Sequence, residues 1–350
     1  MCPKLIEIWG IPVYGYGLML ATGFIVASAL LSAEMKRKGI NTDVTEPFVF
    51  VVKWLYVFLV VSLVLTYVFQ YSFGSLFEFA FKSALHIAVT GIIVVAGVFL
   101  FRKHAKESFD LANSVTLLAL TFGVAGSKIL YVMEHLREFS LRPFETVFSP
   151  GGLTFYGGFL LATLAIYVTA RRAKIPFLAV ADAASPALII GYGIARIGCH
   201  LAGDGDYGFP TSLPWGTDYS KGTFPPSEAF RPFPEITSQF PNGVVPDTTS
   251  CHPTPVYELI LCVLIFGLLW RMRSTTNING KLFMMYLTLA GLERFAIEFM
   301  RLNPRFALGL SEAQLIAVLL VGVGAWGWMS FTHSFAAGSL SRKLTDWNTC

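Results

Sequence analysis

The sequence has little charge for its length. Only 14% of its 350 residues are Asp, Glu, Lys or Arg, whereas soluble domains carry about 25%. Hydrophobic residues make up 54% of the chain, and its mean hydropathy is +0.61. This composition argues against a soluble enzyme, whose surface needs more charge, and indicates a protein that crosses a membrane several times. The net charge of +4 is too small to indicate nucleic-acid binding, so we expect no nucleic-acid partner.

Cysteine is scarce and is not arranged in pairs. The five cysteines are Cys2, Cys199, Cys251, Cys262 and Cys350. They form no CxxC pair and no zinc spacing, which excludes a disulfide framework as the organising principle. Cys199 and Cys251 bracket one long polar segment, and the sequence leaves open whether they form a disulfide there or remain buried thiols. The N-terminal residues also lack the pattern of a secretory signal, so we expect no lipid on Cys2.

Long hydrophobic runs, in contrast, fill the chain. A membrane-spanning helix needs about 20 mainly apolar residues. Nine segments qualify: 15–33, 48–69, 83–101, 112–133, 151–170, 178–198, 255–271, 282–300 and 312–332. We therefore expect an all-α polytopic membrane protein, with a single transmembrane domain over residues 1–350. Residues 199–254 are rich in Pro, Gly, Ser and Thr, and we expect them to form an ordered head on one membrane face.

Basic clusters follow every odd-numbered span. They are MKRK (35–38), RKHAK (102–106), ARRAK (170–174), WRMR (270–273) and SRK (341–343). Because Lys and Arg gather in short cytoplasmic loops, these ends are predicted to be cytoplasmic. The N-terminus then lies outside, the C-terminus inside and the head outside.

Charged residues gather at the outer ends of the predicted spans. Arg196 ends the sixth span, Glu258 begins the seventh, and Arg294 and Glu298 lie in the outer half of the eighth. Arg294, Glu298 and Arg301 are spaced to share one helix face. Ionisable groups in membrane helices are costly and usually functional. We interpret Arg196 and Arg294 as two arginines that grip a phosphate; a structural ion pair is the alternative for Arg301.

The stretch ARIGCHLAGDGDYG (195–208) holds residue types that bind metals, namely Cys199, His200, Asp204 and Asp206. An adjacent Cys-His pair is unusual for tetrahedral zinc. A calcium loop starting at Asp204 would need Glu eleven residues later, where the sequence has Trp215. We therefore expect no metal, and a metal-dependent lipid-phosphate hydrolase remains the alternative function.

Other polar residues begin spans on the predicted outer face. Tyr16 in YGYGLM (14–19) and Tyr156 in GGLTFYGGF (151–159) are either interfacial aromatics or lipid contacts. The glycines around Tyr156 suit either close helix packing or a lipid lying against the backbone. His252 precedes a helix start that Pro253 favours. At the opposite face, Asp182 suits a helix N-terminus and is expected to be structural.

Six motifs, in order along the chain, resemble the prolipoprotein diacylglyceryl transferase family. They are YGLM (16–19), GGLTFYGG (151–158), DAASPALIIGYGIARIGCHLAGDGDYG (182–208), HPTPVYE (252–258), ERFAIEFMR (293–301) and LSEAQLIA (310–317). The resemblance implies a multi-pass enzyme of the bacterial inner membrane whose active site faces the periplasm. It implies transfer of the diacylglyceryl group of phosphatidylglycerol to the lipobox cysteine of a preprolipoprotein, the first step of lipoprotein maturation. It implies no cofactor, and we expect a monomer.

The resemblance also implies site residues. Arg196 matches the arginine that binds the phospholipid, and Arg294 matches the second essential arginine. The downstream acidic position of the family falls on Asp204 or Asp206. The residues expected to bind phosphatidylglycerol are Arg196, Tyr16, Glu298, Arg301, Asp204, Asp206, Gly208 and His252.

Three departures from the family pattern bear on the mechanism. The family has His where this chain has Tyr156 and Asn where it has Cys199, and residues 48–101 add two helices to the seven of simpler members. We predict that His200 supplies the missing base, because His titrates near neutral pH, and that Tyr156 assists. A positive site that activates the thiol without a base and a non-catalytic paralogue are the alternatives.

Overall fold

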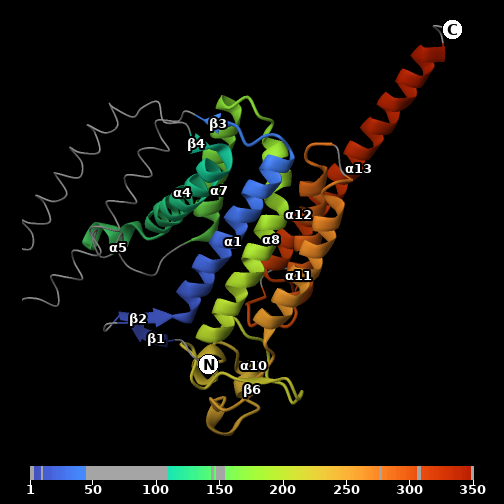
Figure 1. Cartoon of the computed structure of the whole chain (residues 1–350). Helices are drawn as coiled ribbons and strands as arrows, with labels where there is room; N and C mark the ends of the chain where they lie inside the picture. The colour runs from blue at the N-terminus through green and yellow to red at the C-terminus, as the bar shows by residue number, and fades with distance from the viewer. Residues whose placement is uncertain are drawn as a thin grey trace, which may run out of the picture. The chain divides into compact units, whose positions relative to one another are not determined.

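The computed structural model describes residues 4–8, 11–44, 109–142, 146, 154–275, 278–305 and 309–347. The chain divides into two compact units, Met1–Glu34 with Leu178–Cys350 and Met35–Phe177. Figure 1 shows that the described elements are mainly helices. The predicted helical fold class is therefore correct for the described part of the chain.

The first unit contains most of the described helices. Its elements are β1 (Lys4–Ile8), β2 (Ile11–Tyr14), α1 (Gly15–Arg37, whose last residues belong to the second unit), α8 (Phe177–Ala202), β5 (Thr217–Asp218), α9 (Pro226–Ala229), α10 (Pro234–Thr237), η1 (Pro241–Gly243), β6 (Ser250–Cys251), α11 (Thr254–Met272), α12 (Lys281–Ile297) and α13 (Glu312–Trp347). β1 and β2 pair antiparallel, as do β5 and β6. Helices α1 and α8 lie side by side, because a Cβ on Gly23 would stand 2.9 Å from the carbonyl oxygen of Gly191.

The second unit is built on two helices packed together. Its elements are β3 (Asp43–Val44), β4 (Phe109–Asp110), α4 (Leu111–Glu134), α5 (Leu136–Leu141) and α7 (Phe155–Arg172). Asp110 caps α4, since its carboxylate accepts a hydrogen bond from the amide of Asn113 at 2.8 Å. A side chain at Gly157 would collide with the backbone of Gly126, so α7 approaches α4 as closely as glycine allows. Gly157 and Gly158, which follow Tyr156, therefore serve helix packing here.

Five described helices are long and apolar enough to cross a membrane. They are α1, α4, α8, α11 and the Glu312–Thr332 part of α13, and they coincide with five of the nine predicted spans. The predicted spans at 151–170 and 282–300 overlap α7 (Phe155–Arg172) and α12 (Lys281–Ile297), which have 18 and 17 residues. The predicted spans at 48–69 and 83–101 lie outside the described residues. The side of the membrane on which each helix ends stays a prediction.

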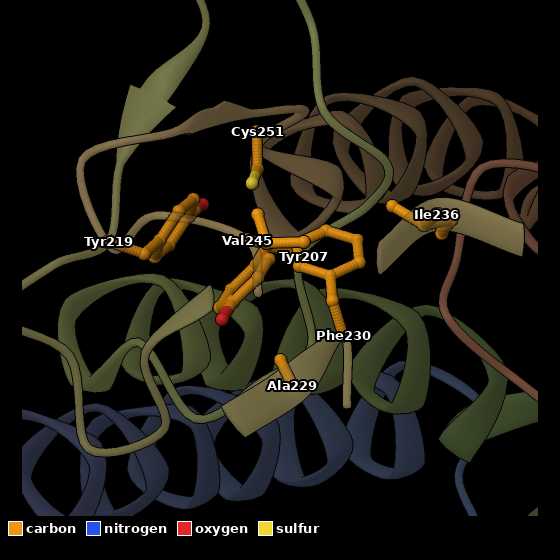
Figure 2. Close-up of a cluster of buried hydrophobic side chains, with 7 residues drawn as sticks. All are labelled: Tyr207, Tyr219, Ala229, Phe230, Ile236, Val245 and Cys251. Atoms are coloured by element: carbon orange, nitrogen blue, oxygen red, sulfur yellow. The ribbon is translucent and has the colours of Figure 1, made fainter. Parts of the chain in front are cut away.

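The polar segment after α8 has a small core of its own. Tyr207 and Tyr219 stack with ring centroids 4.2 Å apart, and five further buried residues surround them. The cluster in Figure 2 consists of Tyr207, Tyr219, Ala229, Phe230, Ile236, Val245 and Cys251. This segment, called the head below, begins at Gly203, because residues 199–202 continue α8 as its last turn. That it lies on one face of a membrane stays a prediction.

Asp182 has a different structural role from the one predicted. It lies five residues inside α8, which begins at Phe177, so it does not cap its own helix. Its fully buried carboxylate instead accepts hydrogen bonds from the amides of Gly280 and Phe283, at 2.9 and 2.8 Å. It caps the first turn of α12, whose amides have no partner within the helix.

Candidate active site

Three arginines and three carboxylates meet where α8, α11 and α12 end or begin beside the head. The members of this charge cluster are Arg196, Arg294, Arg301, Asp206, Glu258 and Glu298. They come from four separate segments of the chain. Their formal charges cancel, which is the condition under which such groups are tolerated in a membrane protein interior.

Glu258 is the centre of the charge cluster. Its side chain is fully buried in the first turns of α11. One carboxylate oxygen lies 2.9 Å from Nε of Arg196, and the other lies 3.3 Å from Arg294 and 3.4 Å from Arg301. The hydroxyl of Tyr192 also donates a hydrogen bond to it at 3.2 Å. One buried carboxylate thus orients all three arginines.

Asp206 joins two of these arginines from the head. One of its oxygens pairs with Arg196 and the other with Arg301. Its side chain is 29% exposed, whereas those of Glu258 and Glu298 are fully buried. Burial by itself raises the pKa of Asp206, but the positive charges of Arg301 and Arg196 outweigh it and hold that pKa below its ordinary value.

The backbone around Asp206 fastens the head to the helices. The hydroxyl of Thr254 donates to the carbonyl of Asp206 at 2.6 Å, and the amide of Gly208 donates to the carbonyl of His252 at 2.9 Å. Gly208 also forms a β-bridge with Arg301. A Cβ at Gly208 would collide with the carbonyl of Met300. Gly208, expected to bind lipid, therefore allows a close backbone approach, and any lipid contact stays a prediction.

The eighth predicted span needs a correction. Helix α12 ends at Ile297, Glu298 is its C-cap, and Arg301 follows in an extended bridge rather than on a helical face. Arg294 still pairs with Glu298, with Nη2 2.9 Å from the carboxylate, while Nε of Arg301 lies 3.9 Å away. Arg294 and Glu298 therefore pair at the predicted helical spacing, whereas Arg301 reaches them because the chain turns after α12.

Tyr16 lies beside the charge cluster. It is the second residue of α1, and a Cβ on Gly198 would stand 3.1 Å from its Cα. Gly198 is two residues after Arg196 in α8. The structure therefore places Tyr16 next to the helix turn that carries Arg196, and its assignment as a lipid contact stays a prediction.

Two histidines have aromatic hydrogen-bond partners. Nδ1 of His200 lies 3.0 Å from the hydroxyl of Tyr219, and Nδ1 of His252 lies 3.2 Å from that of Tyr257. Burial lowers the pKa of His252. His200 also lines a cavity of about 410 Å³. The residues around that cavity are His200, Trp215, Thr217, Pro253, Val256, Tyr257 and Ile260.

Three of the four possible metal ligands lie together. The Sγ of Cys199 and carboxylate oxygens of Asp204 and Asp206 lie within 4.8 Å of one another, whereas the ring of His200 contacts Tyr219. Arg196 points its guanidinium at the same group, 3.6 Å from the sulfur. Burial and the neighbouring Asp206 raise the pKa of Asp204. The positive charge next to this group is therefore that of Arg196.

Cys199 and Cys251 are separate, buried thiols. Cys251 belongs to the aromatic core of the head, and burial raises its pKa to about 12. Of the two readings left open by the sequence, the structure has the buried-thiol form. Tyr156 belongs to the second unit, at the start of α7, and its role in the site stays a prediction.

Glu258 is the main site residue that the set of predicted lipid contacts omits. Its position at the predicted outer end of a span could have indicated a site residue, because charged residues inside membrane helices usually have a function. The polar partners of Glu298, namely Ser311 and Asn303, gave no such signal. They lie in different segments from Glu298 and their contacts depend on the fold.

Apolar helices that enclose a buried cluster of arginines and carboxylates define a membrane protein of the helical, multi-pass class. The sequence model described as prolipoprotein diacylglyceryl transferase matches residues 3–92 and 79–330. The chain belongs to that family, whose members are transferases.

Individual relatives agree with this assignment. A phosphatidylglycerol–prolipoprotein diacylglyceryl transferase of Dehalococcoides mccartyi is 30% identical over 226 residues, which cover 63% of this chain and 77% of the relative. One from Clostridium tetani is 25% identical over 326 residues, which cover 93% of this chain and 95% of the relative. One from Tropheryma whipplei is 27% identical over 274 residues, which cover 73% of this chain and 92% of the relative. The likeness therefore extends along nearly the whole chain.

Proposed function

We propose that this protein transfers the diacylglyceryl group of phosphatidylglycerol to the thiol of a cysteine in a prolipoprotein. Family membership and the names of the relatives support the reaction. The observation that carries it in the structure is the charge cluster, because it brings three arginines together beside the ends of apolar helices. The acceptor is a lipobox cysteine, and the site faces the periplasmic side of the bacterial inner membrane in a monomeric enzyme.

The reaction needs a site for developing negative charge. The sulfur attacks the glycerol carbon of the diacylglyceryl group that carries the phosphate, and a C–S bond forms. The bond between that carbon and the oxygen attached to phosphorus breaks. The bonding electrons leave with the phosphate, and glycerol phosphate is released. The thiol proton goes to a base or to the departing phosphate, which gains a charge as it leaves. Arginines that are already oriented stabilise this charge without reorganisation.

Arg196 and Arg294 are the arginines we assign to the phosphate. Their side chains are 15% and 25% exposed, whereas that of Arg301 is 8% exposed. Each guanidinium also forms an ion pair with the buried carboxylate of Glu258. This arrangement leaves partly exposed guanidinium groups in fixed orientations, which favours bidentate binding of phosphate.

Asp206 competes with the phosphate for Arg196. Its two carboxylate oxygens pair separately with Arg196 and Arg301. Two oxygens of a phosphate could occupy the same positions. The residue lies in a loop where Gly205 has φ +87°, and its side chain is the most exposed carboxylate of the cluster. In place of the direct lipid contact expected from the sequence, we propose that phosphatidylglycerol displaces Asp206 from Arg196, which keeps Glu258 as its partner.

His200 is our candidate for the base. Its Nδ1 faces the hydroxyl of Tyr219, and a proton on Nδ1 donated to that oxygen leaves Nε2 able to accept the proton of the thiol. A neutral imidazole is required, so activity rises with pH as the ring loses its proton. We expect His200→Gln to lower the rate several-fold and to abolish this rise, which lies between about pH 5 and 7. Full activity of that variant across the range would exclude His200 as the base.

A transfer assay tests the proposed function. The protein in detergent with EDTA is given phosphatidylglycerol and a lipobox peptide, and peptide masses are measured. We expect a gain of one diacylglyceryl group, no gain with phosphatidylethanolamine, and no gain on a peptide whose cysteine is replaced by serine. Transfer in EDTA also excludes the metal-dependent alternative, which requires an ion at Cys199, His200, Asp204 and Asp206. No transfer by folded protein, beside a working relative, would contradict the proposal.

A further inference from the structure

The motif LSEAQLIA (310–317) forms the start of α13 and has no chemical role so far. Ser311 and Gln314 make a capping box there. The amide of Gln314 donates to Oγ of Ser311 at 3.2 Å, and the amide of Ser311 donates to Oε1 of Gln314 at 3.1 Å. Both side chains are buried. The capping box therefore explains the motif as a helix start, but not every contact that it makes.

The hydroxyl of Ser311 has a second partner. It donates a hydrogen bond to Oε1 of Glu298 at 2.8 Å, and the side-chain amide of Asn303 donates to the same oxygen at 2.6 Å. The other oxygen of Glu298 faces Arg294 at 2.9 Å. Glu298 thus receives two neutral donors on one oxygen and an arginine on the other.

This division of the carboxylate fixes its rotation. A glutamate side chain can turn about its last torsion, which has broad minima. In a fully buried position the two donors on Oε1 allow one orientation, and that orientation aims Oε2 at Arg294. Arg305 further joins the two segments, because it donates to Oε1 of Gln314 at 2.7 Å and to the carbonyl of Glu298 at 3.3 Å.

We propose that Ser311 and Asn303 are positioning residues for phosphate binding by Arg294, acting through Glu298. The inference rests on the proposed function and extends it to the start of α13. Glu258 holds one side of the Arg294 guanidinium, and Glu298 holds the other. Loss of either donor lets Glu298 turn, and Arg294 then loses one of its two fixed contacts. Small displacements of an oriented group are costly in rate.

A double-mutant cycle separates positioning from helix capping. Ser311→Gly removes the hydroxyl but leaves an acceptable N-cap, since glycine is tolerated there at a cost of only a few tenths of a kcal/mol. We expect this variant and Asn303→Ala each to lower kcat about tenfold without a change in KM for the lipobox peptide. Ser311→Thr retains the hydroxyl and should restore activity. Thr332→Ala, an exposed change in the same helix, should match the unmodified protein.

Arg294→Lys supplies the second arm of the cycle. If Ser311 acts through Arg294, Ser311→Gly costs less than twofold once Arg294 is lysine, because coupled residues are non-additive. An equal tenfold loss in both backgrounds would overturn the inference, as would an unchanged rate for Ser311→Gly. The same cycle is measured on the affinity for phosphatidylglycerol in nanodiscs. If the unmodified protein binds the lipid without transferring it, the proposed function fails. In that case non-additive effects of Ser311→Gly and Arg294→Lys on the lipid affinity uphold the positioning role, and additive effects reject it. Absence of both transfer and lipid binding contradicts both.

Discussion

Glu258 shows how one side chain controls the electrostatics of the site. It is fully buried and contacts all three arginines of the charge cluster. Removing one partner of a buried ionic group leaves charge without compensation, which typically costs about 3–5 kcal/mol. The arginines would then also lose their common anchor. At this scale, the carboxylate is as important as the arginines that it holds.

We therefore predict that Glu258→Gln inactivates and destabilises the protein. The cluster would carry an excess positive charge, and we expect activity to fall at least about 100-fold together with a lower melting temperature in detergent. Glu235→Gln, at an exposed position in the head, is the matched control and should change neither. A Glu258→Gln variant with ordinary melting and ordinary activity would show that the cluster is not organised around this residue.

Asp206 gives the cluster a dependence on pH. Its pKa is lowered in the folded protein, so its ion pairs contribute stability that is present above the ordinary carboxyl pKa of about 4. This contribution is lost as the pH falls through the lowered folded-state value. We expect Asp206→Asn to be less stable than the unmodified protein near neutral pH and to lose less stability on acidification. Parallel melting curves of the two proteins at all pH values would contradict this.

At the scale of elements, Asp182 links α8 to the helix that carries Arg294. Its carboxylate accepts hydrogen bonds from the amides of Gly280, the N-cap of α12, and Phe283 in the first turn. We predict that Asp182→Ala costs about 1–2 kcal/mol in stability, the typical value of a lost cap. Asp182→Asn keeps one oxygen acceptor and should be intermediate. A calorimetric melt measures both, and equal melting temperatures for the three proteins would reject the capping role.

The sequence predicts the helices better than it predicts their ends and partners. Five spans coincide with described apolar helices because hydrophobic length is a local property of the chain. The end of α12 at Ile297, the partner of Asp182 and the bonds from Ser311 and Asn303 to Glu298 depend on contacts between distant segments. Arg196, Arg294 and Arg301 were recognisable because charge in an apolar setting stands out. Their orientation by Glu258 required the fold.

For the whole molecule, the central claim is that the charge cluster carries the transfer of a diacylglyceryl group. The most direct measurement compares peptide masses after reaction with phosphatidylglycerol for Arg196→Ala and Arg231→Ala. Arg231 is an exposed arginine of the head outside the cluster. We predict that Arg231→Ala transfers the lipid at the ordinary rate and that Arg196→Ala loses about 100- to 1000-fold while still melting cooperatively. Undiminished transfer by Arg196→Ala would contradict the account.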